Sequence, residues 1–228
     1  MNNVIDFSVA VPYAGQLRGL VTVPTGFEPE KEKLPVIVFL HGLGERDDGT
    51  KETLELLKRH GIPKYFCENP DYKGLRVITV SPQCPGNYTW SQMSNQLMDY
   101  INAAIEKFGG DPARVAVTGL SMGGFGTWSM ITQFPDYFYR AAPICGGGAP
   151  GRARNILPGM KIRVFHSIDD DAVPYECSVL MTKEAIKAGA DIEFTTYCRE
   201  GHGSWNKAYG DTDLIEWLAG GALCDTAE

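Results

Sequence analysis

Short apolar runs alternate with longer helical segments through most of this chain, and this alternation constrains the fold more than any other feature. The runs are nearly continuous in apolar residues or rich in β-branched ones, as strands buried on both faces of a sheet are. Such an order predicts an α/β fold: a mainly parallel sheet with right-handed crossovers, flanked by helices. The predicted strands are Val36–Leu40, Arg76–Ser81, Val115–Thr118, Ala141–Cys145, Ile162–His166 and Ile192–Cys198. The predicted helices are Lys51–His60, Ser91–Phe108, Met122–Gln133, Tyr175–Ala188 and Ser204–Leu218.

A hairpin is predicted before this alternation begins. Its strands are Ile5–Val11 and Leu17–Val23, and Ala14-Gly15 between them supplies the turn residues. The hairpin brings the sheet to eight strands and adds an antiparallel strand at one edge. Open sheets of this kind bind ligands beyond the carboxyl ends of their strands, so the residues that follow each strand are the candidates for a site.

Length and composition point to one folded unit. The 228 residues contain no repeat and no linker rich in Pro, Gly and Ser, which predicts a single domain over residues 1–228. The segments between strands are short, so no lid domain is expected. With 43% hydrophobic residues, the chain is not of a disordered or fibrous class. The net charge of −7 argues against nucleic acid and anionic membranes as partners.

The N-terminus and the cysteines predict a cytoplasmic protein. The first six residues lack the basic and apolar regions of a secretory signal, and runs such as Val36–Leu40 are too short to span a bilayer. No Cys-x-x-Cys pair occurs, which excludes zinc-ribbon and thioredoxin-like proteins. Free buried thiols are therefore expected, although the even number of cysteines is also compatible with a disulfide. The six cysteines are Cys67, Cys84, Cys145, Cys177, Cys198 and Cys224.

A candidate nucleophile follows the predicted strand Val115–Thr118. The segment Gly119-Leu120-Ser121-Met122-Gly123 has the spacing Gly-x-Ser-x-Gly between a strand and a helix, which is typical of a nucleophile elbow. Ser121 would sit on a sharp, strained turn, and side chains at the two glycines would collide with neighbouring elements. The helix that follows would direct its N-terminal N–H groups at a developing oxyanion.

A serine hydroxyl needs a base, and His202 is the best candidate among four histidines. His202 lies between two glycines after the last predicted strand, where elbow hydrolases place their base. His60 is expected to be solvated, and His166 to be a hydrogen-bonded structural residue. His41 follows a buried strand and opens a glycine turn.

The acid is expected after Ile162–His166, where three aspartates are adjacent: Asp169, Asp170 and Asp171. One should hold the imidazole and the others should face solvent or cap the next helix, because three neighbouring carboxylates cannot all be buried. The loop after Val36–Leu40 is expected to supply an N–H group to an oxyanion hole, with Leu43 as one donor and Met122 as the other.

Together these motifs resemble the lidless carboxylesterases and acyl-protein thioesterases of the α/β-hydrolase superfamily. The most similar branch is the bacterial one labelled phospholipase/carboxylesterase, feruloyl esterase-like or predicted peptidase. The family's acid motif, His-Gly-x-x-Asp-x-x-Val-Pro, aligns on His166 and Val173-Pro174 and implies Asp170, although Ser167 replaces the glycine. The matching segments are Leu40–Arg46, Ser81–Pro85 with Trp90, Gly119–Gly124, His166–Pro174 and Gly201–Trp205.

The resemblance also implies substrate contacts at Gln83, Trp90 and Trp205, for which ordinary packing is the alternative. We expect a serine carboxylesterase that acts through an acyl-enzyme on small or soluble esters, including aryl or cinnamoyl esters of plant carbohydrate. A peptidase or thioesterase using the same residues, or a non-catalytic binding protein, are the alternatives. No metal or organic cofactor is expected, because the corresponding motifs are absent from the sequence.

Overall fold

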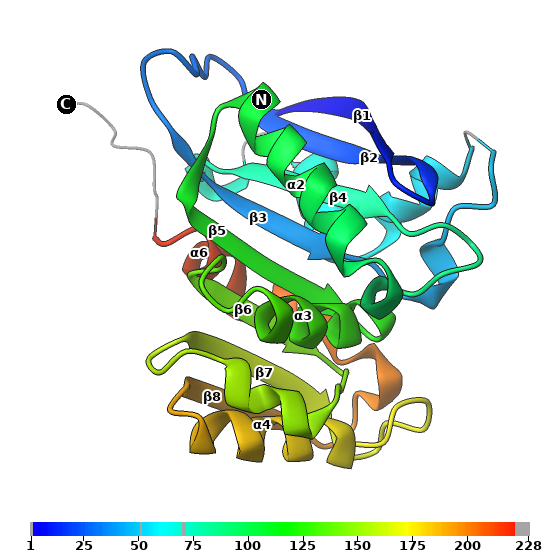
Figure 1. Cartoon of the computed structure of the whole chain (residues 1–228), viewed down its shortest axis with the longest axis vertical. Helices are drawn as coiled ribbons and strands as arrows, with labels where there is room; N and C mark the ends of the chain where they lie inside the picture. The colour runs from blue at the N-terminus through cyan, green and yellow to red at the C-terminus, as the bar shows by residue number, and fades with distance from the viewer. Residues whose placement is uncertain (1, 51, 70–71, 222–228) are drawn as a thin grey trace.

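The structure is a computed structural model that describes residues 2–50, 52–69 and 72–221. Within these residues the sheet has eight strands in the order β1-β2-β4-β3-β5-β6-β7-β8, which confirms the predicted mainly parallel sheet (Figure 1). Strand β2 is antiparallel to both of its neighbours, and the strands from β4 to β8 in this order pair in parallel. The strands are β1 (Asn2–Val11), β2 (Gly15–Pro24), β3 (Leu34–Leu40), β4 (Ile78–Gln83), β5 (Gly110–Leu120), β6 (Arg140–Ile144), β7 (Lys161–Ser167) and β8 (Asp191–Tyr197).

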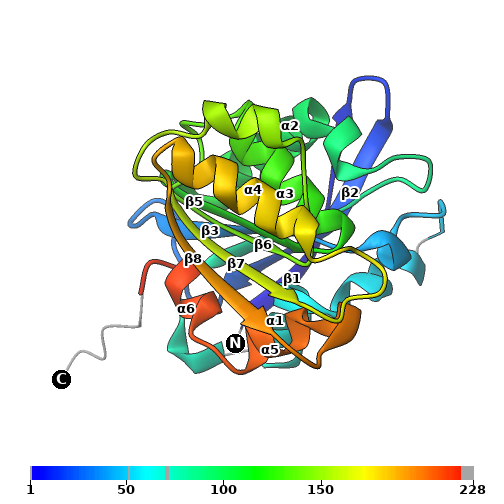
Figure 2. The ribbon, with the colours of Figure 1, turned by 90° about the horizontal axis from the view of Figure 1, so that it is seen from below.

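Helices cover both faces of the sheet. Figure 2 shows α2, α3 and α4 on one face and α1, α5 and α6 on the other. The α-helices are α1 (Gly61–Glu68), α2 (Ser94–Phe108), α3 (Met122–Gln133), α4 (Glu176–Lys187), α5 (Trp205–Gly210) and α6 (Leu214–Leu218). The 3-10 helices are η1 (Leu43–Glu45), η2 (Glu52–Arg59), η3 (Tyr72–Gly74), η4 (Trp90–Gln92), η5 (Pro150–Asn155) and η6 (Gly201–Gly203).

Each face of the sheet carries its own hydrophobic core, because side chains alternate along a strand. In β3, Val36 and Val38 pack into the core under α2, α3 and α4, whereas Ile37 and Phe39 pack into the core under the other helices. All seven residues of β3 are buried. This strand therefore runs through the centre of the molecule and brings the loop that follows Leu40 to the carboxyl edge of the sheet.

Two of the predicted helices differ from the structure. The prediction Lys51–His60 begins outside the described residues, and Glu52–Arg59 form the 3-10 helix η2. The adjoining α1, which has Pro63 in its first turn, is not among the predicted helices. Proline is tolerated in a first helical turn, where its missing N–H has no partner. The prediction of one helix over Ser204–Leu218 is wrong: the Thr212 hydroxyl donates to the carbonyl of Ala208 and accepts from the N–H of Leu214, which separates α5 from α6.

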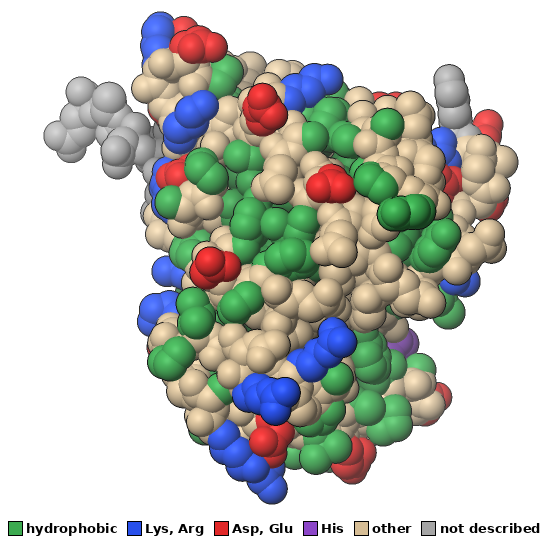
Figure 3. Space-filling view, in the orientation of Figure 1, with side chains coloured by type: hydrophobic (Ala, Val, Ile, Leu, Met, Phe, Trp, Pro, Cys, Tyr) green, Lys and Arg blue, Asp and Glu red, His purple; other side chains and the backbone are tan. Residues whose placement is uncertain are grey.

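The surface carries charges of both signs. On the face seen in Figure 3, Lys, Arg, Asp and Glu side chains lie interspersed among apolar ones. Among the described residues, no helix combines the length and the apolar character needed to cross a membrane. Cys224 lies outside the described residues; the described cysteines are free, and they are Cys67, Cys84, Cys145, Cys177 and Cys198.

Candidate active site

Ser121 lies on the sharp turn between β5 and α3. Its backbone angles are φ 54° and ψ −118°, a strained conformation that non-glycine residues rarely adopt. The flanking glycines allow this turn. A Cβ at Gly123 would lie 1.8 Å from the carbonyl oxygen of Leu40, and one at Gly119 would lie 2.5 Å from the carbonyl oxygen of Gly123. The Gly-x-Ser-x-Gly spacing therefore lets β3, β5 and α3 meet at the serine.

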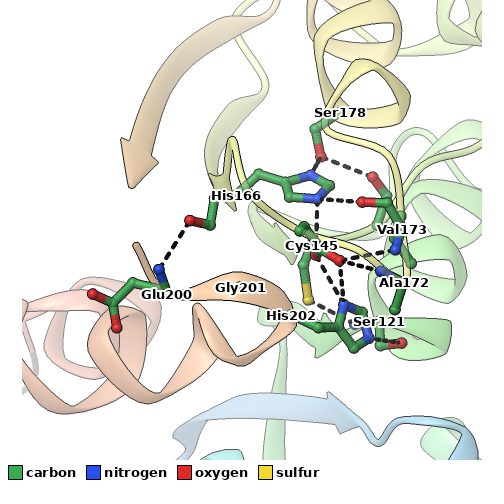
Figure 4. A network of polar contacts seen from close by, with 12 residues as sticks. Ser121, Cys145, His166, Ala172, Val173, Ser178, Glu200, Gly201 and His202 are labelled. Atoms are coloured by element: carbon green, nitrogen blue, oxygen red, sulfur yellow. Dashed lines mark hydrogen bonds and ion pairs between the residues drawn. The ribbon is translucent and has the colours of Figure 1, made fainter. Parts of the chain in front are cut away.

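His202 and Asp170 form a continuous hydrogen-bonded chain with Ser121, and Figure 4 shows the imidazole of His202 beside Ser121. The Nε2 atom of His202 lies 2.9 Å from Ser121 Oγ, and its Nδ1 atom lies 2.8 and 2.9 Å from the two carboxylate oxygens of Asp170. Because a carboxylate can only accept, Nδ1 carries the hydrogen and Nε2 is free to accept the serine proton. The structure thus brings together the three residues that the sequence singles out.

The carboxylate of Asp170 is shielded from solvent. Its Oδ1 atom accepts the N–H groups of Ala172 and Val173 at 3.0 and 2.9 Å. Burial acts to raise the pKa of Asp170, but these N–H groups and His202 outweigh it, so the pKa lies below its ordinary value. The carboxylate therefore stays charged beside His202 at neutral pH.

The two neighbouring aspartates point elsewhere. Asp169 is exposed, and its Oδ1 atom accepts the N–H of Gly201 at 3.1 Å and the hydroxyl of Ser167, so it fastens the loop that carries His202. Asp171 is also exposed. The register implied by His166 and Val173 therefore agrees with the residue that contacts the imidazole.

The predicted oxyanion donors begin two helices next to Ser121. Met122 is the first residue of α3 and Leu43 is the first residue of η1. The N–H groups at a helix start have no partner within the helix, so both are free to bind an anion. A Cβ at Gly42 would lie 3.8 Å from Ser121 Cβ, which shows how closely the Leu43 loop passes the serine.

His41 fixes the orientation of the Leu43 peptide. The N–H of Cys84 donates to His41 Nε2 at 2.9 Å, so the ring hydrogen is on Nδ1, which donates to the carbonyl oxygen of Gly42 at 2.6 Å. Burial lowers the pKa of His41 to about 4, which keeps the ring neutral. In a trans peptide the N–H points opposite to the C=O, so the Leu43 N–H is directed away from the buried His41 ring.

Gln83 and Trp90 brace the same loop from β4 and η4. Both are fully buried. The amide of Gln83 donates to the carbonyl oxygens of Glu45 and Thr53 at 2.9 and 2.7 Å, and the indole of Trp90 donates to the carbonyl oxygen of His41 at 3.0 Å. The structure therefore places these two residues behind the loop.

A cavity of about 480 Å³ opens at Ser121 and His202. Its apolar wall is formed by Leu43, Met122, Phe125, Ala172 and Val173, and Thr89 and Ser91 complete the lining. Gln83, Trp90 and Trp205 are not among the described residues that line it. Trp205 instead packs edge-on against His202 and His60, with ring centroids 5.3 and 5.6 Å away.

A second, more polar hollow of about 640 Å³ adjoins the cavity, and the two share Leu43. Among the side chains that line this hollow are Gln16, Arg46, Asp48 and Asn87. Arg46 donates its Nε–H to the carbonyl oxygen of Leu43 at 3.2 Å. The loop of η1 therefore stands between an apolar and a polar compartment.

Comparison with known proteins identifies the family. Residues 14–147, more than half of the chain, match the family model named Esterase. The chain belongs to the esterase family of the α/β-hydrolase superfamily. A thermostable esterase of known structure is 32% identical, with a TM-score of 0.74 over 94% of this chain and 62% of its own.

Peptidases of known structure also share this fold. The acylaminoacyl peptidase of Pyrococcus horikoshii is 16% identical, with a TM-score of 0.70 over 100% of this chain and 42% of its own. Dipeptidyl peptidase family member 1 of Caenorhabditis elegans is 23% identical over 75% of this chain and 25% of its own length. The chain thus spans only a quarter of the length of that curated relative.

One group of potential metal ligands lies in the described part of the chain. Ligand atoms of Cys145, Asp170 and His202 lie within 4.8 Å of one another. Burial raises the pKa of Cys145 to about 12, so its sulfur is a thiol rather than the thiolate that metals prefer. Asp170 and His202 are already bonded to each other, so the group suits proton transfer better than metal binding.

Phe125 and Val173 are site residues that the sequence reasoning missed. Phe125 lies four residues after Ser121, one helical turn along α3, and this spacing could have placed it beside the nucleophile. Val173 follows the acid in the loop between β7 and α4, and its place in the cavity wall depends on the loop conformation.

Proposed function

We propose that this protein is a serine carboxylesterase that hydrolyses small or soluble esters through an acyl-enzyme. One observation carries the proposal: the hydrogen-bonded chain from Asp170 through His202 to Ser121 ends at the floor of an apolar cavity. A serine activated in this way is a nucleophile for carboxylic carbonyl groups, and the cavity offers an acyl group a place to bind.

The proposed reaction has two halves. His202 takes the proton of Ser121 as Oγ attacks the ester carbonyl, and the N–H groups of Leu43 and Met122 stabilise the oxyanion. The protonated His202 then gives its proton to the departing alcohol, which leaves an acyl-serine. Water attacks this acyl group with His202 again as the base, and the carboxylic acid departs as the serine is restored.

We propose aryl or medium-length acyl groups for the cavity, because Leu43, Phe125 and Val173 present apolar surfaces beside the serine. The adjoining hollow, with Arg46 and Asn87 in its lining, suits the polar remainder of such an ester. Cinnamoyl esters of plant carbohydrate have both features, so they are the substrates we propose first.

A serine peptidase is the second candidate. One relative by sequence and one protein of the same fold are named as peptidases, and amide hydrolysis needs the same nucleophile, base and acid. A thioesterase would use them as well. Only the preferred substrate therefore distinguishes an esterase from a peptidase or a thioesterase here.

A panel of substrates tests the proposal. Chromogenic acyl esters, feruloyl esters, acyl thioesters and aminoacyl anilides are run side by side with the parent and with Ser121→Ala. We expect turnover of the esters to exceed that of the anilides, and Ser121→Ala to lose at least about a thousandfold. A fluorophosphonate probe should label the parent alone. Preference for the anilides would support the peptidase, and labelling of Ser121→Ala would overturn the assignment of the nucleophile.

A further inference from the structure

Two histidines contact the carboxylate of Asp170. The side chain of His202 is 26% exposed, whereas that of His166 is fully buried, so His166 approaches from the interior. The Nε2 atom of His166 lies 3.1 Å from Asp170 Oδ2 and 3.0 Å from the carbonyl oxygen of Val173 (Figure 4). Both partners only accept hydrogen bonds, so Nε2 must carry a hydrogen.

The other nitrogen of His166 is held by Ser178 from α4. Ser178 Oγ lies 2.8 Å from His166 Nδ1 and 2.8 Å from the carbonyl oxygen of Gly146. Burial lowers the pKa of His166 against the opposing effects of Val173 and Asp170, so the ring is neutral at pH 7. With the ring hydrogen on Nε2, the neutral ring has an acceptor at Nδ1, and the single hydroxyl hydrogen of Ser178 is shared between Nδ1 and the carbonyl oxygen of Gly146. This contact favours the tautomer that presents Nε2–H to Asp170.

The two oxygens of Asp170 have different partners. Oδ1 accepts the N–H groups of Ala172 and Val173, whereas Oδ2 is shared by the imidazoles of His202 and His166. We propose that His166 is a positioning residue, which holds Oδ2 from the interior and limits how strongly Asp170 retains the proton of His202. This inference rests on the proposed function, because it concerns the basicity of the proposed base.

The other titratable groups near His166 do not take over its contact with Asp170 from the interior. Among the residues that the structure describes, the titratable side chains beside His166 are Asp170 and His202, Cys145 after β6, and Tyr175, whose ring packs edge-on at 5.6 Å. Cys145 is a neutral thiol, because burial raises its pKa to about 12. A carboxylate that loses one donor holds its remaining partner's proton more tightly. Loss of the Nε2–H should therefore move the acid limb of the kcat/KM profile to higher pH.

Two variants of similar size separate this role from packing. His166→Gln keeps an N–H donor, whereas His166→Met has none. We expect the acid limb of His166→Met to move up by about half a pH unit or more, and that of His166→Gln to stay with the parent. At a fixed pH on that limb, such a shift lowers kcat/KM severalfold in His166→Met and leaves His166→Gln unchanged. Equal limbs in parent and Met variant would overturn the proposal, as would equal shifts in both variants.

Ser178→Ala provides a milder change should His166→Met fail to fold. It frees the His166 tautomer, so the limb should move in the same direction by a smaller amount; an unmoved limb contradicts the proposal. The low-field proton resonance of the His202–Asp170 hydrogen bond can be followed by NMR without substrate, and its titration should move likewise. If the parent showed no serine-dependent ester turnover, the proposed function would be overturned. If the parent were active but the variants' titrations did not move, only the role of His166 would be overturned.

Discussion

The indole N–H of Trp90 donates a hydrogen bond to the carbonyl oxygen of His41 across 3.0 Å, although 49 positions separate the two residues. This bond joins η4 to the loop that carries the proposed oxyanion donor Leu43. Both side chains are buried, and their rings also pack edge-on at 5.0 Å. The contact therefore concerns the geometry of catalysis more than the binding of substrate.

Trp90→Phe should accordingly lower kcat by about tenfold with little change in KM, because a displaced oxyanion donor weakens transition-state binding. Steady-state kinetics with a soluble aryl ester measure both constants. Trp128→Phe is the matched control, since the buried Nε1 of Trp128 has no hydrogen-bond partner among the described residues. A rise in KM at constant kcat would instead point to a direct substrate contact of Trp90.

The three adjacent aspartates should respond differently to replacement by asparagine. Asp170→Asn should reduce kcat by about ten-thousandfold, because an amide can present the wrong partner to His202 Nδ1. Asp169→Asn should cost far less, since an amide oxygen can still accept the N–H of Gly201, and Asp171→Asn should resemble the parent. Burst titration with an aryl ester gives the active-site concentration for each variant. If Asp169→Asn were the most damaging, the acid would be misassigned.

Acid should destabilise the fold through His41. Its pKa is about 4 in the folded protein, below the ordinary 6.5, so the folded state binds this proton less tightly than the unfolded state. The stability that His41 contributes is complete above about pH 6.5 and should fall by about 3 kcal/mol as the pH drops to 4. Urea unfolding at a series of pH values measures this. His41→Asn should show a shallower pH dependence than the parent, and equal slopes would refute the assignment.

Gly123→Ala should destabilise the protein by more than about 2 kcal/mol, because the new Cβ would lie 1.8 Å from the carbonyl oxygen of Leu40. Gly151→Ala is the control: no heavy atom lies within 4 Å of its ideal Cβ, so its unfolding free energy should change by less than about 0.5 kcal/mol. Thermal and urea unfolding compare the two. Similar stabilities would mean that β3 and α3 can separate without cost.

The sequence predicts the sheet well because buried parallel strands are nearly continuous apolar runs, as β3 and the buried second half of β5 are here. It also places Ser121, Asp170 and His202 on loops after strands, where the topology brings them to one edge. Interactions between distant segments leave no such local pattern. The bracing by Gln83 and Trp90 depends on where β4 lies relative to β3, and the division between α5 and α6 depends on the hydroxyl of Thr212.

Ser121 and His202 lie on parts of the fold that differ in how well they are anchored. Ser121 stands between β5 and α3, both largely buried, whereas His202 lies in η6, which has no buried residue. Segments with few buried contacts open before the global transition. Gentle heating or dilute denaturant should therefore release His202 while the serine elbow stays folded, so catalysis would cease in a population that calorimetry still registers as native.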